Sequence, residues 1–275
     1  MNTTLILQEN AKWFLKERPK LQENVINSEK FKAARVFLYR EEILENLYYI
    51  LKLLDRSGCE DFLSENEIRS VVDVGGANGD LSFVFSKSGF RTTLVDMATP
   101  AGLNGPLVAS LINDQLKANV RVVDFDVDRY FCYSDLIEHT VNSGAFDHCE
   151  PEEMYDLVIC VGLLYHLRNP LAFLNSLAKI CRFCVLGTFC MSYLPDNVTR
   201  IRDIPIAYLL DGELANDPTN HWIMTHASYE RMVKISGFEV ITNIVDFGRA
   251  DQVSNAIDKN CYEREFLLVK SMAVS

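Results

Sequence analysis

Residues 71–80 read Val71-Val72-Asp73-Val74-Gly75-Gly76-Ala77-Asn78-Gly79-Asp80, and this stretch decides the fold of the chain. Its first four residues are typical of a buried strand, and the glycines that follow predict a turn. Because glycine has no Cβ, the backbone of such a turn can approach a ligand closely. A helix is expected over residues 80–88, with Gly89 as its C-cap. A strand, a glycine turn and a helix together indicate an α/β fold that binds a nucleotide-like cofactor at the carboxyl ends of its strands.

The spacing of the glycines bears on which cofactor binds. A dinucleotide site requires the pattern Gly-x-Gly-x-x-Gly, which brings a helix N-terminus to a pyrophosphate. This chain has Gly-Gly-Ala-Asn-Gly instead, and Asp80 would place a carboxylate beside that pyrophosphate. Like charges repel, so the sequence disfavours NAD.

The same residues resemble the first motif of class I S-adenosylmethionine (SAM)-dependent methyltransferases. The middle glycine of that motif is replaced here by alanine. The resemblance implies that SAM is bound by the residues of this motif, namely Asp73, Gly75, Gly76, Ala77 and Gly79.

An acidic residue ends the next expected strand, residues 91–96. Asp96 follows Asp73 by about 20 residues, which is the spacing that one βαβ unit produces. A carboxylate at this point can accept hydrogen bonds from both ribose hydroxyls. The alternative is a loop aspartate that caps the turn before Pro100.

The third expected strand, residues 120–126, also ends in acids, Asp124 and Asp126. In class I methyltransferases an acid near this point receives the adenine amino group. The resemblance therefore implies a cofactor contact here, for which Asp126 is chosen over Asp124.

The fourth strand carries the most specific pattern. Residues 155–162 are almost continuously apolar, as expected of a central parallel strand buried on both faces. Residues 161–171 then read Val-Gly-Leu-Leu-Tyr-His-Leu-Arg-Asn-Pro-Leu, which resembles a methyltransferase subgroup that includes the tRNA wobble-uridine carboxymethyltransferases and their uncharacterised relatives. This resemblance implies that Val161 and Gly162 also contact the cofactor. It leaves the substrate open, because a fold does not fix a function.

The expected fold class is α/β: a Rossmann-like class I methyltransferase sheet of seven strands, the last of them antiparallel, with an N-terminal helical extension. The antiparallel last strand is implied by the resemblance alone. We expect residues 1–66 to form the helical extension or cap. Residues 67–275 would form the SAM-binding methyltransferase domain, with about residues 191–226 covering the substrate.

Composition limits the class of protein. The chain has 275 residues, of which 48% are hydrophobic, enough for a full core. It has neither an apolar run of ~20 residues nor the start of a signal peptide, so a cytoplasmic protein with no membrane partner is expected. Most of the eight cysteines lie in apolar, strand-like runs and are expected to be buried thiols. Cys181 and Cys184 have metal-ligand spacing but no second pair, so no metal site is expected.

Net charge bears on the substrate. The chain carries 27 Lys and Arg against 38 Asp and Glu, a net charge of −11. Proteins that grip folded RNA normally present a basic surface. A small-molecule substrate is therefore favoured, with tRNA as the alternative. The sequence leaves the oligomeric state open.

The segment of residues 203–226 is dense in side chains that bind ligands. An Asn-Asp-Pro-Thr turn with capping side chains explains Asp217, Pro218 and Thr225 without a function. Four other residues of this segment are candidates for contact with the substrate: Asn216, Asn220, Trp222 and His226. Two further candidates lie outside it, Arg40 on an earlier expected helix and Tyr165 after the fourth strand.

SAM carries an activated methyl group, so the enzyme must align the acceptor and, for a hydroxyl or amine, remove a proton. His166, at the mouth of the expected cleft, is the leading candidate for the base, with His221, His226 and Glu213 as further candidates. Alternatively, the Tyr165-His166 pair only shapes the pocket.

Two other functions stay open. One is a tRNA-modifying methyltransferase or carboxymethyltransferase. If it used carboxy-SAM, the extra carboxylate would need a cation from Arg35, Arg40 or Arg168. The other is a SAM-binding protein without catalysis. The sequence does not identify the acceptor.

Overall fold

The structure is a computed structural model that describes residues 2–34, 36, 44–99, 103–129, 132–141, 154–194, 196, 198–212, 214, 217–246 and 262–273. The chain forms two compact units. The N-terminal unit is Met1–Val127 with Phe131–Ile159, and the C-terminal unit is Asp128–Tyr130 with Cys160–Ser275. The expected division of the chain after residue 66 stays a prediction.

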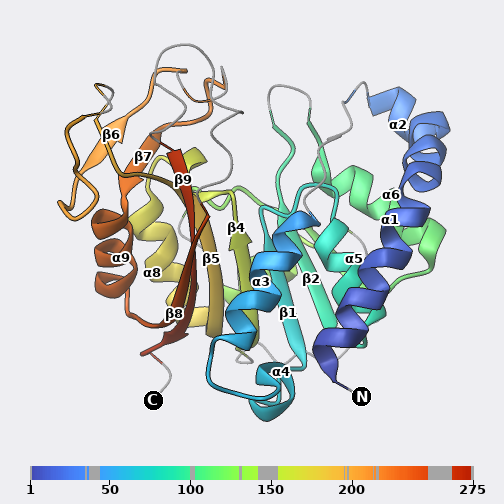
Figure 1. Ribbon diagram of the computed structural model, residues 1–275. Helices are drawn as coiled ribbons and strands as arrows, with labels where there is room; N and C mark the ends of the chain where they lie inside the picture. The colour runs from blue at the N-terminus through green and yellow to red at the C-terminus, as the bar shows by residue number, and fades with distance from the viewer. Residues whose placement is uncertain are drawn as a thin grey trace. The chain divides into compact units, whose positions relative to one another are not determined.

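Helices alternate with parallel strands in the N-terminal unit. Its elements are α1 (Thr3–Asn27), α2 (Glu29–Ala34), α3 (Glu45–Asp55), α4 (Phe62–Glu65), β1 (Ser70–Val74), α5 (Asp80–Lys87), β2 (Arg91–Asp96), α6 (Gly105–Leu116), β3 (Val120–Asp124), α7 (Tyr133–Glu138) and the larger part of β4 (Tyr155–Val161). The strands lie in the order β3-β2-β1-β4 (Figure 1). Val72 is paired with Thr93 on one side and Val158 on the other. Because parallel strands end at the same edge, the glycine turn after β1 lies next to the acid that ends β2.

The long helix α1 lies within the helical extension expected for residues 1–66, although residues 1–27 look polar with scattered apolar positions. Asn2 caps its N-terminus by accepting hydrogen bonds from the N–H groups of Thr4 and Leu5. Its buried residues recur mostly at every seventh position and form one narrow stripe: Leu7, Phe14, Leu21 and Val25. Helix α1 lies beside α5 (Figure 1). The rings of Phe14 and Phe83 stack between them, with centroids 5.9 Å apart.

The C-terminal unit contains η1 (Leu164–His166), α8 (Pro170–Ile180), β5 (Cys181–Met191), β6 (Ala207–Leu209), β7 (Trp222–Thr225), α9 (His226–Ile235), β8 (Phe238–Asp246) and β9 (Tyr262–Ser271). Strand β9 runs antiparallel to both β5 and β8. The short hairpin of β6 and β7, which the sequence did not predict, joins the carboxyl end of β5 through β7.

Local sequence signals account for the helix starts in this unit. The Asn169 side chain accepts a hydrogen bond from Ala172 N, and Pro170 occupies the first helical position of α8. Thr225 caps α9 in the same way, as predicted.

Parallel strands connected through helices, with β9 antiparallel, confirm the expected Rossmann-like α/β class. Among the described residues, no helix has both the length and the apolar content that a bilayer span requires.

Candidate functional site

The turn after β1 has an unusual backbone. Gly75, Ala77 and Gly79 have positive φ angles of 74°, 50° and 87°, a region that glycine adopts most readily. A Cβ at Gly76 would collide with the Asp73 carboxylate and with Leu94. The backbone of the turn is therefore packed against the side chains of Asp73 in β1 and Leu94 in β2.

Gly105, which was not among the residues predicted from the sequence, also packs against the turn. A Cβ at Gly105, the first residue of α6, would lie 2.5 Å from the carbonyl oxygen of Ala77. The helix thus approaches the turn closely from one side. Its local signal is the sequence Asn104-Gly105-Pro106, in which Asn104 caps the helix.

Asp96 is held against the turn by its own hydrogen bonds. Its Oδ2 accepts from the N–H of Ala77 at 2.6 Å, and its Oδ1 accepts from the N–H of Met97 at 2.7 Å. Burial raises the pKa of Asp96 to about 6, and the nearby charge of Asp124 adds to this rise. Each carboxylate oxygen retains acceptor capacity, so this group can still receive hydroxyl donors.

Asp73 supports the turn from below. Its Oδ2 accepts a hydrogen bond from Ser82 Oγ at 2.8 Å, and the residue is only 3% exposed. Burial raises the pKa of Asp73 to about 7, while the Ser82 hydroxyl opposes that rise.

Asp80 forms an ion pair with a residue of helix α1. Arg18 Nε of α1 lies 2.9 Å from Asp80 Oδ2, and both side chains are largely buried. This contact brings a cation to the first residue of α5.

The acids after β3 occupy neighbouring positions. Asp124 Oδ1 accepts a hydrogen bond from Ala98 N at 3.2 Å, and Asp126 is half-buried two residues later. The N-terminal unit thus gathers the predicted glycine turn, Asp96 and Asp126 at the carboxyl ends of β1 to β3.

In the C-terminal unit, Val161 ends β4 and Gly162 continues with a φ of 81°. The N–H of Gly162 donates to the carbonyl of Gly187 at 2.8 Å. A Cβ at Gly162 would lie 3.4 Å from the Tyr165 hydroxyl, so the ring of Tyr165 lies near this turn.

His166 ends the single turn η1 and is half-buried. Its Nδ1 lies 2.9 Å from Thr219 Oγ1 and 3.3 Å from the carbonyl oxygen of Thr219. Burial lowers the pKa of His166, while the charge of Asp217 opposes that fall. A histidine with a lowered pKa is neutral at pH 7 and can accept a proton.

Residues 217–222 lie against this turn, although some 50 residues separate the two in sequence. His221 N donates to the carbonyl oxygen of Tyr165 at 2.7 Å. Asn220 donates from Nδ2 to the Leu214 carbonyl, and its buried Oδ1 has no partner among the described residues. The indole N–H of Trp222 is also buried without a partner in that part of the chain. The structure therefore brings together Tyr165, His166, Asn220, His221 and Trp222.

His226 lies elsewhere in this unit, in a buried ionic network. Its Nδ1 is 2.7 Å from Glu265 Oε2, and its Nε2 is 2.7 Å from Glu263 Oε2. Burial alone would lower the pKa of His226, but the two glutamates raise it. Both ring nitrogens are thus engaged with carboxylates, an arrangement that favours a structural role.

The same network contains the metal-ligand chemistry that sequence spacing did not reveal. Ligand atoms of Cys190, His226 and Glu265 lie within 4.8 Å of one another, and all three residues are buried. A metal ion would have to displace a proton from His226. The expected absence of a metal stays a prediction.

Four of the residues named as candidates, Arg35, Arg40, Glu213 and Asn216, lie outside the described part of the chain.

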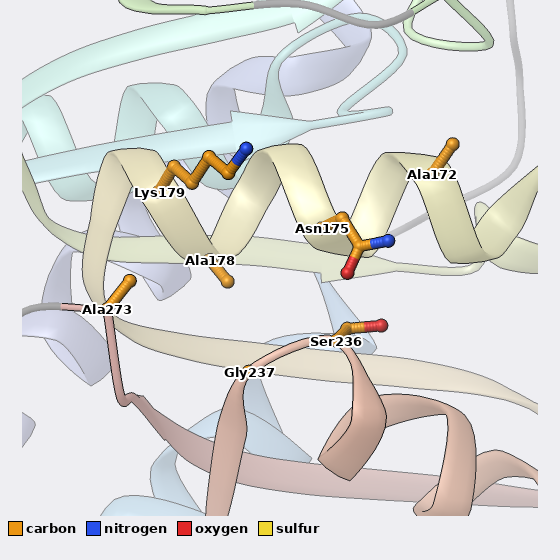
Figure 2. A pocket seen from close by; sticks show the side chains of 7 residues that line it. All are labelled: Ala172, Asn175, Ala178, Lys179, Ser236, Gly237 and Ala273. Atoms are coloured by element: carbon orange, nitrogen blue, oxygen red, sulfur yellow. The ribbon is translucent and has the colours of Figure 1, made fainter.

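A pocket of about 360 Å³ lies beside α8, near the end of α9 (Figure 2). None of the predicted site residues lines it. Its walls are Ala172, Asn175, Ala178, Lys179, Ser236, Gly237 and Ala273.

Known proteins match the chain in family and in fold. A family model described as "Methyltransferase domain" matches residues 38–243. The crystal structure of the N-terminal domain of EvdMO1 with SAH (S-adenosylhomocysteine) bound is 16% identical, covers 92% of this chain and 97% of that chain, and has a TM-score of 0.52.

Two further crystal structures are similar. The cyclase SpnF is 10% identical, with 74% of each chain covered and a TM-score of 0.50. The BH2331 protein of Bacillus halodurans C-125 is 15% identical, with 80% of this chain and 97% of that chain covered and a TM-score of 0.50. At these identities, the three structures establish the fold alone. No curated protein matches the chain by sequence. The family model covers more than half of the chain, which therefore belongs to the methyltransferase-domain family and is a SAM-dependent methyltransferase.

Proposed function

We propose that the chain binds SAM at the glycine turn after β1 and transfers its methyl group to a small metabolite or biosynthetic intermediate. The observation that carries this proposal is the position of Asp96, whose carboxylate is fixed against the turn by the N–H groups of Ala77 and Met97. A carboxylate so placed can accept both ribose hydroxyls of an adenosyl ligand. The EvdMO1 domain, which has SAH bound, supports the same cofactor.

The remaining cofactor contacts follow from the same fit. The turn of Gly75, Gly76, Ala77 and Gly79, supported by Asp73, has backbone but little side chain to offer a ligand. Asp126 would receive the adenine amino group, and Val161 with Gly162 would complete the contact.

SAM supplies an activated methyl group, which leaves its sulfur for the acceptor and yields SAH. The chain's own part is to hold the acceptor and take its proton. We assign the role of general base, which takes this proton, to His166, with His221 and Glu213 as alternatives. Substrate contacts are assigned to Tyr165, Asn216, Asn220, Trp222 and Arg40. The predicted contact by His226 is not retained, because Glu263 and Glu265 occupy both of its ring nitrogens.

A small acceptor is preferred to tRNA because the chain has a net charge of −11. Carboxy-SAM would need a cation for its carboxylate. One candidate, Arg168, already lies 3.8 Å from Asp128, which favours SAM itself.

The decisive experiment is native mass spectrometry of the purified protein, followed by calorimetric titration with SAM, SAH and NAD. We expect SAM and SAH to bind and NAD not to bind. Asp96→Ala should lower the affinity for SAM by about 10- to 100-fold, because one or two hydrogen bonds to a charged group are lost. Asp114→Ala, an exposed acid on α6, is the matched control and should leave the affinity unchanged. Binding of NAD, or of no adenosyl ligand, would overturn the proposal.

Further outcomes separate the alternatives. A co-purified ligand heavier than SAM by a carboxylate would point to carboxymethyl transfer. Bound SAM that yields no SAH with any fraction of a cell extract would favour a non-catalytic SAM-binding protein. Dialysis against EDTA should leave SAM binding and turnover unchanged, because methyl transfer from SAM needs no metal. Cytoplasmic location stays a prediction.

A further inference from the structure

His166 lies at the end of a chain of hydrogen bonds that the sequence did not reveal. Thr219 Oγ1 lies 2.9 Å from His166 Nδ1 and 2.6 Å from Asp217 Oδ1. Asp217 and His166 are half-buried, and the exposed Thr219 is hydrogen-bonded to both of them.

The chemistry of these groups fixes where the protons lie. An ionised carboxylate only accepts, so the single hydroxyl proton of Thr219 is donated to Asp217. The Thr219 oxygen must then accept from His166 Nδ1. The carbonyl oxygen of Thr219, 3.3 Å from the same nitrogen, can also only accept. Nδ1 therefore carries a proton whether the ring is neutral or charged.

The consequence concerns the other ring nitrogen. If Nδ1 always carries a proton, Nε2 is the atom at which His166 gains and loses one. Within the described part of the chain, Nε2 makes no hydrogen bond. It is therefore left with a lone pair for a ligand.

We propose that Asp217 and Thr219 are positioning residues that hold neutral His166 in the Nδ1–H tautomer and make Nε2 the base of the reaction. This inference rests on the proposed function. The acceptor loses its proton to Nε2 as its electron pair takes the methyl group, and the ring becomes an imidazolium. The Nδ1 proton stays on its hydrogen bond to Thr219, and the charge of Asp217 stabilises the cation. The imidazolium then returns the proton to water.

A purely local explanation exists and can be tested. Thr219 N also donates to Asp217 Oδ1 at 2.8 Å, so the pair could serve the turn alone. Asp196 and Thr199 provide a matched control in the same unit. There the N–H and hydroxyl of Thr199 bind Asp196 at 2.8 and 2.6 Å, and the structure gives neither residue a bond to a histidine.

The test is the ¹⁵N spectrum of the imidazole rings in the full-length protein, with the signals of His166 assigned by their loss in His166→Gln. Above the pKa of His166, we expect the Nδ1–H tautomer in the wild type and in Thr219→Ser. Thr219→Val removes the 2.9 Å contact and leaves only the Thr219 carbonyl at 3.3 Å, so it should raise the fraction of the Nε2–H tautomer, whereas Thr199→Val should not. An Nε2–H tautomer in the wild type, or no change in Thr219→Val, would overturn the inference whether or not the protein methylates anything.

A pH titration in the same spectra tests the role of Asp217. Among the described residues, the charged and titratable groups that face His166 are Asp217, which raises its pKa, His221, which lowers it, and the ring of Tyr165, whose centroid is 4.4 Å from that of His166. Asp217→Asn should therefore lower the pKa of His166, and the acid limb of the pH–rate profile should move to lower pH with it. An unchanged pKa would contradict the assignment.

Turnover gives the second readout, measured as SAH formed from SAM with the small-molecule fraction of a cell extract. Thr219→Val should lower kcat by about 10- to 100-fold with little change in the affinity for SAM, and Thr219→Ser should restore the rate. Full activity in Thr219→Val would overturn the positioning role. No turnover in the wild type, with the expected tautomer present, would count against the proposed function and leave the hydrogen-bond chain standing.

Discussion

At the scale of single residues, Gly76 shows how closely the cofactor turn lies on its strand. Gly76→Ala would place a Cβ against the Asp73 carboxylate and Leu94. We expect a loss of about 1–3 kcal/mol in the free energy of unfolding and weaker SAM binding, because the turn must shift. Denaturant unfolding and calorimetry measure the two effects. Gly58→Ala is the control: it meets open space at a positive φ, so it should lower stability through the backbone but leave SAM affinity unchanged.

His226 makes a prediction about pH. Burial opposes both shifts, yet the contacts within the network raise the pKa of His226 above 6.5 and lower that of Glu263 below 4.5. The contribution of His226 is present below pH 6.5 and is lost as the pH rises through its raised pKa. That of Glu263 is present above pH 4.5 and is lost as the pH falls through its lowered pKa. The network should therefore stabilise the fold most between about pH 4.5 and 6.5.

The variant His226→Gln tests this window. It removes the cation that lies between the two glutamates and leaves Glu263 the more distant cation of Arg202, at 3.9 Å, so we expect a loss of up to about 3–5 kcal/mol near pH 6. Denaturant unfolding at several pH values should show the difference from the wild type shrinking as the pH rises. A difference that does not change with pH would contradict the ionic interpretation.

At the scale of elements, an ion pair links α1 to the start of α5. Arg18 and Asp80 lie 2.9 Å apart with side chains 13% and 2% exposed. Removing the cation in Arg18→Met leaves a buried carboxylate, although the N-terminus of α5 offsets part of its charge. We expect a loss of up to about 3–5 kcal/mol in stability. Lys16→Ala, exposed on the same helix, should change stability by less than about 0.5 kcal/mol.

At the scale of the whole molecule, net charge makes the prediction. With 27 basic and 38 acidic residues, the chain should not bind bulk tRNA even at low salt. A gel-shift titration at about 50 mM salt checks this, with SAM binding as evidence that the same sample is folded. A shift that disappears steeply as salt is added would reveal phosphate contacts and revive the tRNA alternative.

Local patterns were enough to predict much of the fold. The strand and glycine turn of residues 71–80, the parallel strand ending at Asp96 and the helix cap at Thr225 all depend on neighbours within a few positions. The bounds of α1 within the expected helical extension were not predicted, because its buried stripe uses roughly one residue in seven, too few for a clear periodicity.

The sequence by itself therefore determined the fold class, the family and the glycine turn, because strand alternation, helix periodicity and positive-φ turns are written into consecutive residues. Only the tertiary structure decided that Thr219 and Asp217 meet His166, that Arg18 meets Asp80 and that His226 is enclosed by Glu263 and Glu265. These partners are 37 to 62 residues apart along the chain, except within the Asp217–Thr219 turn. A hydrogen bond over such separations depends on how whole elements pack, and no local pattern encodes it.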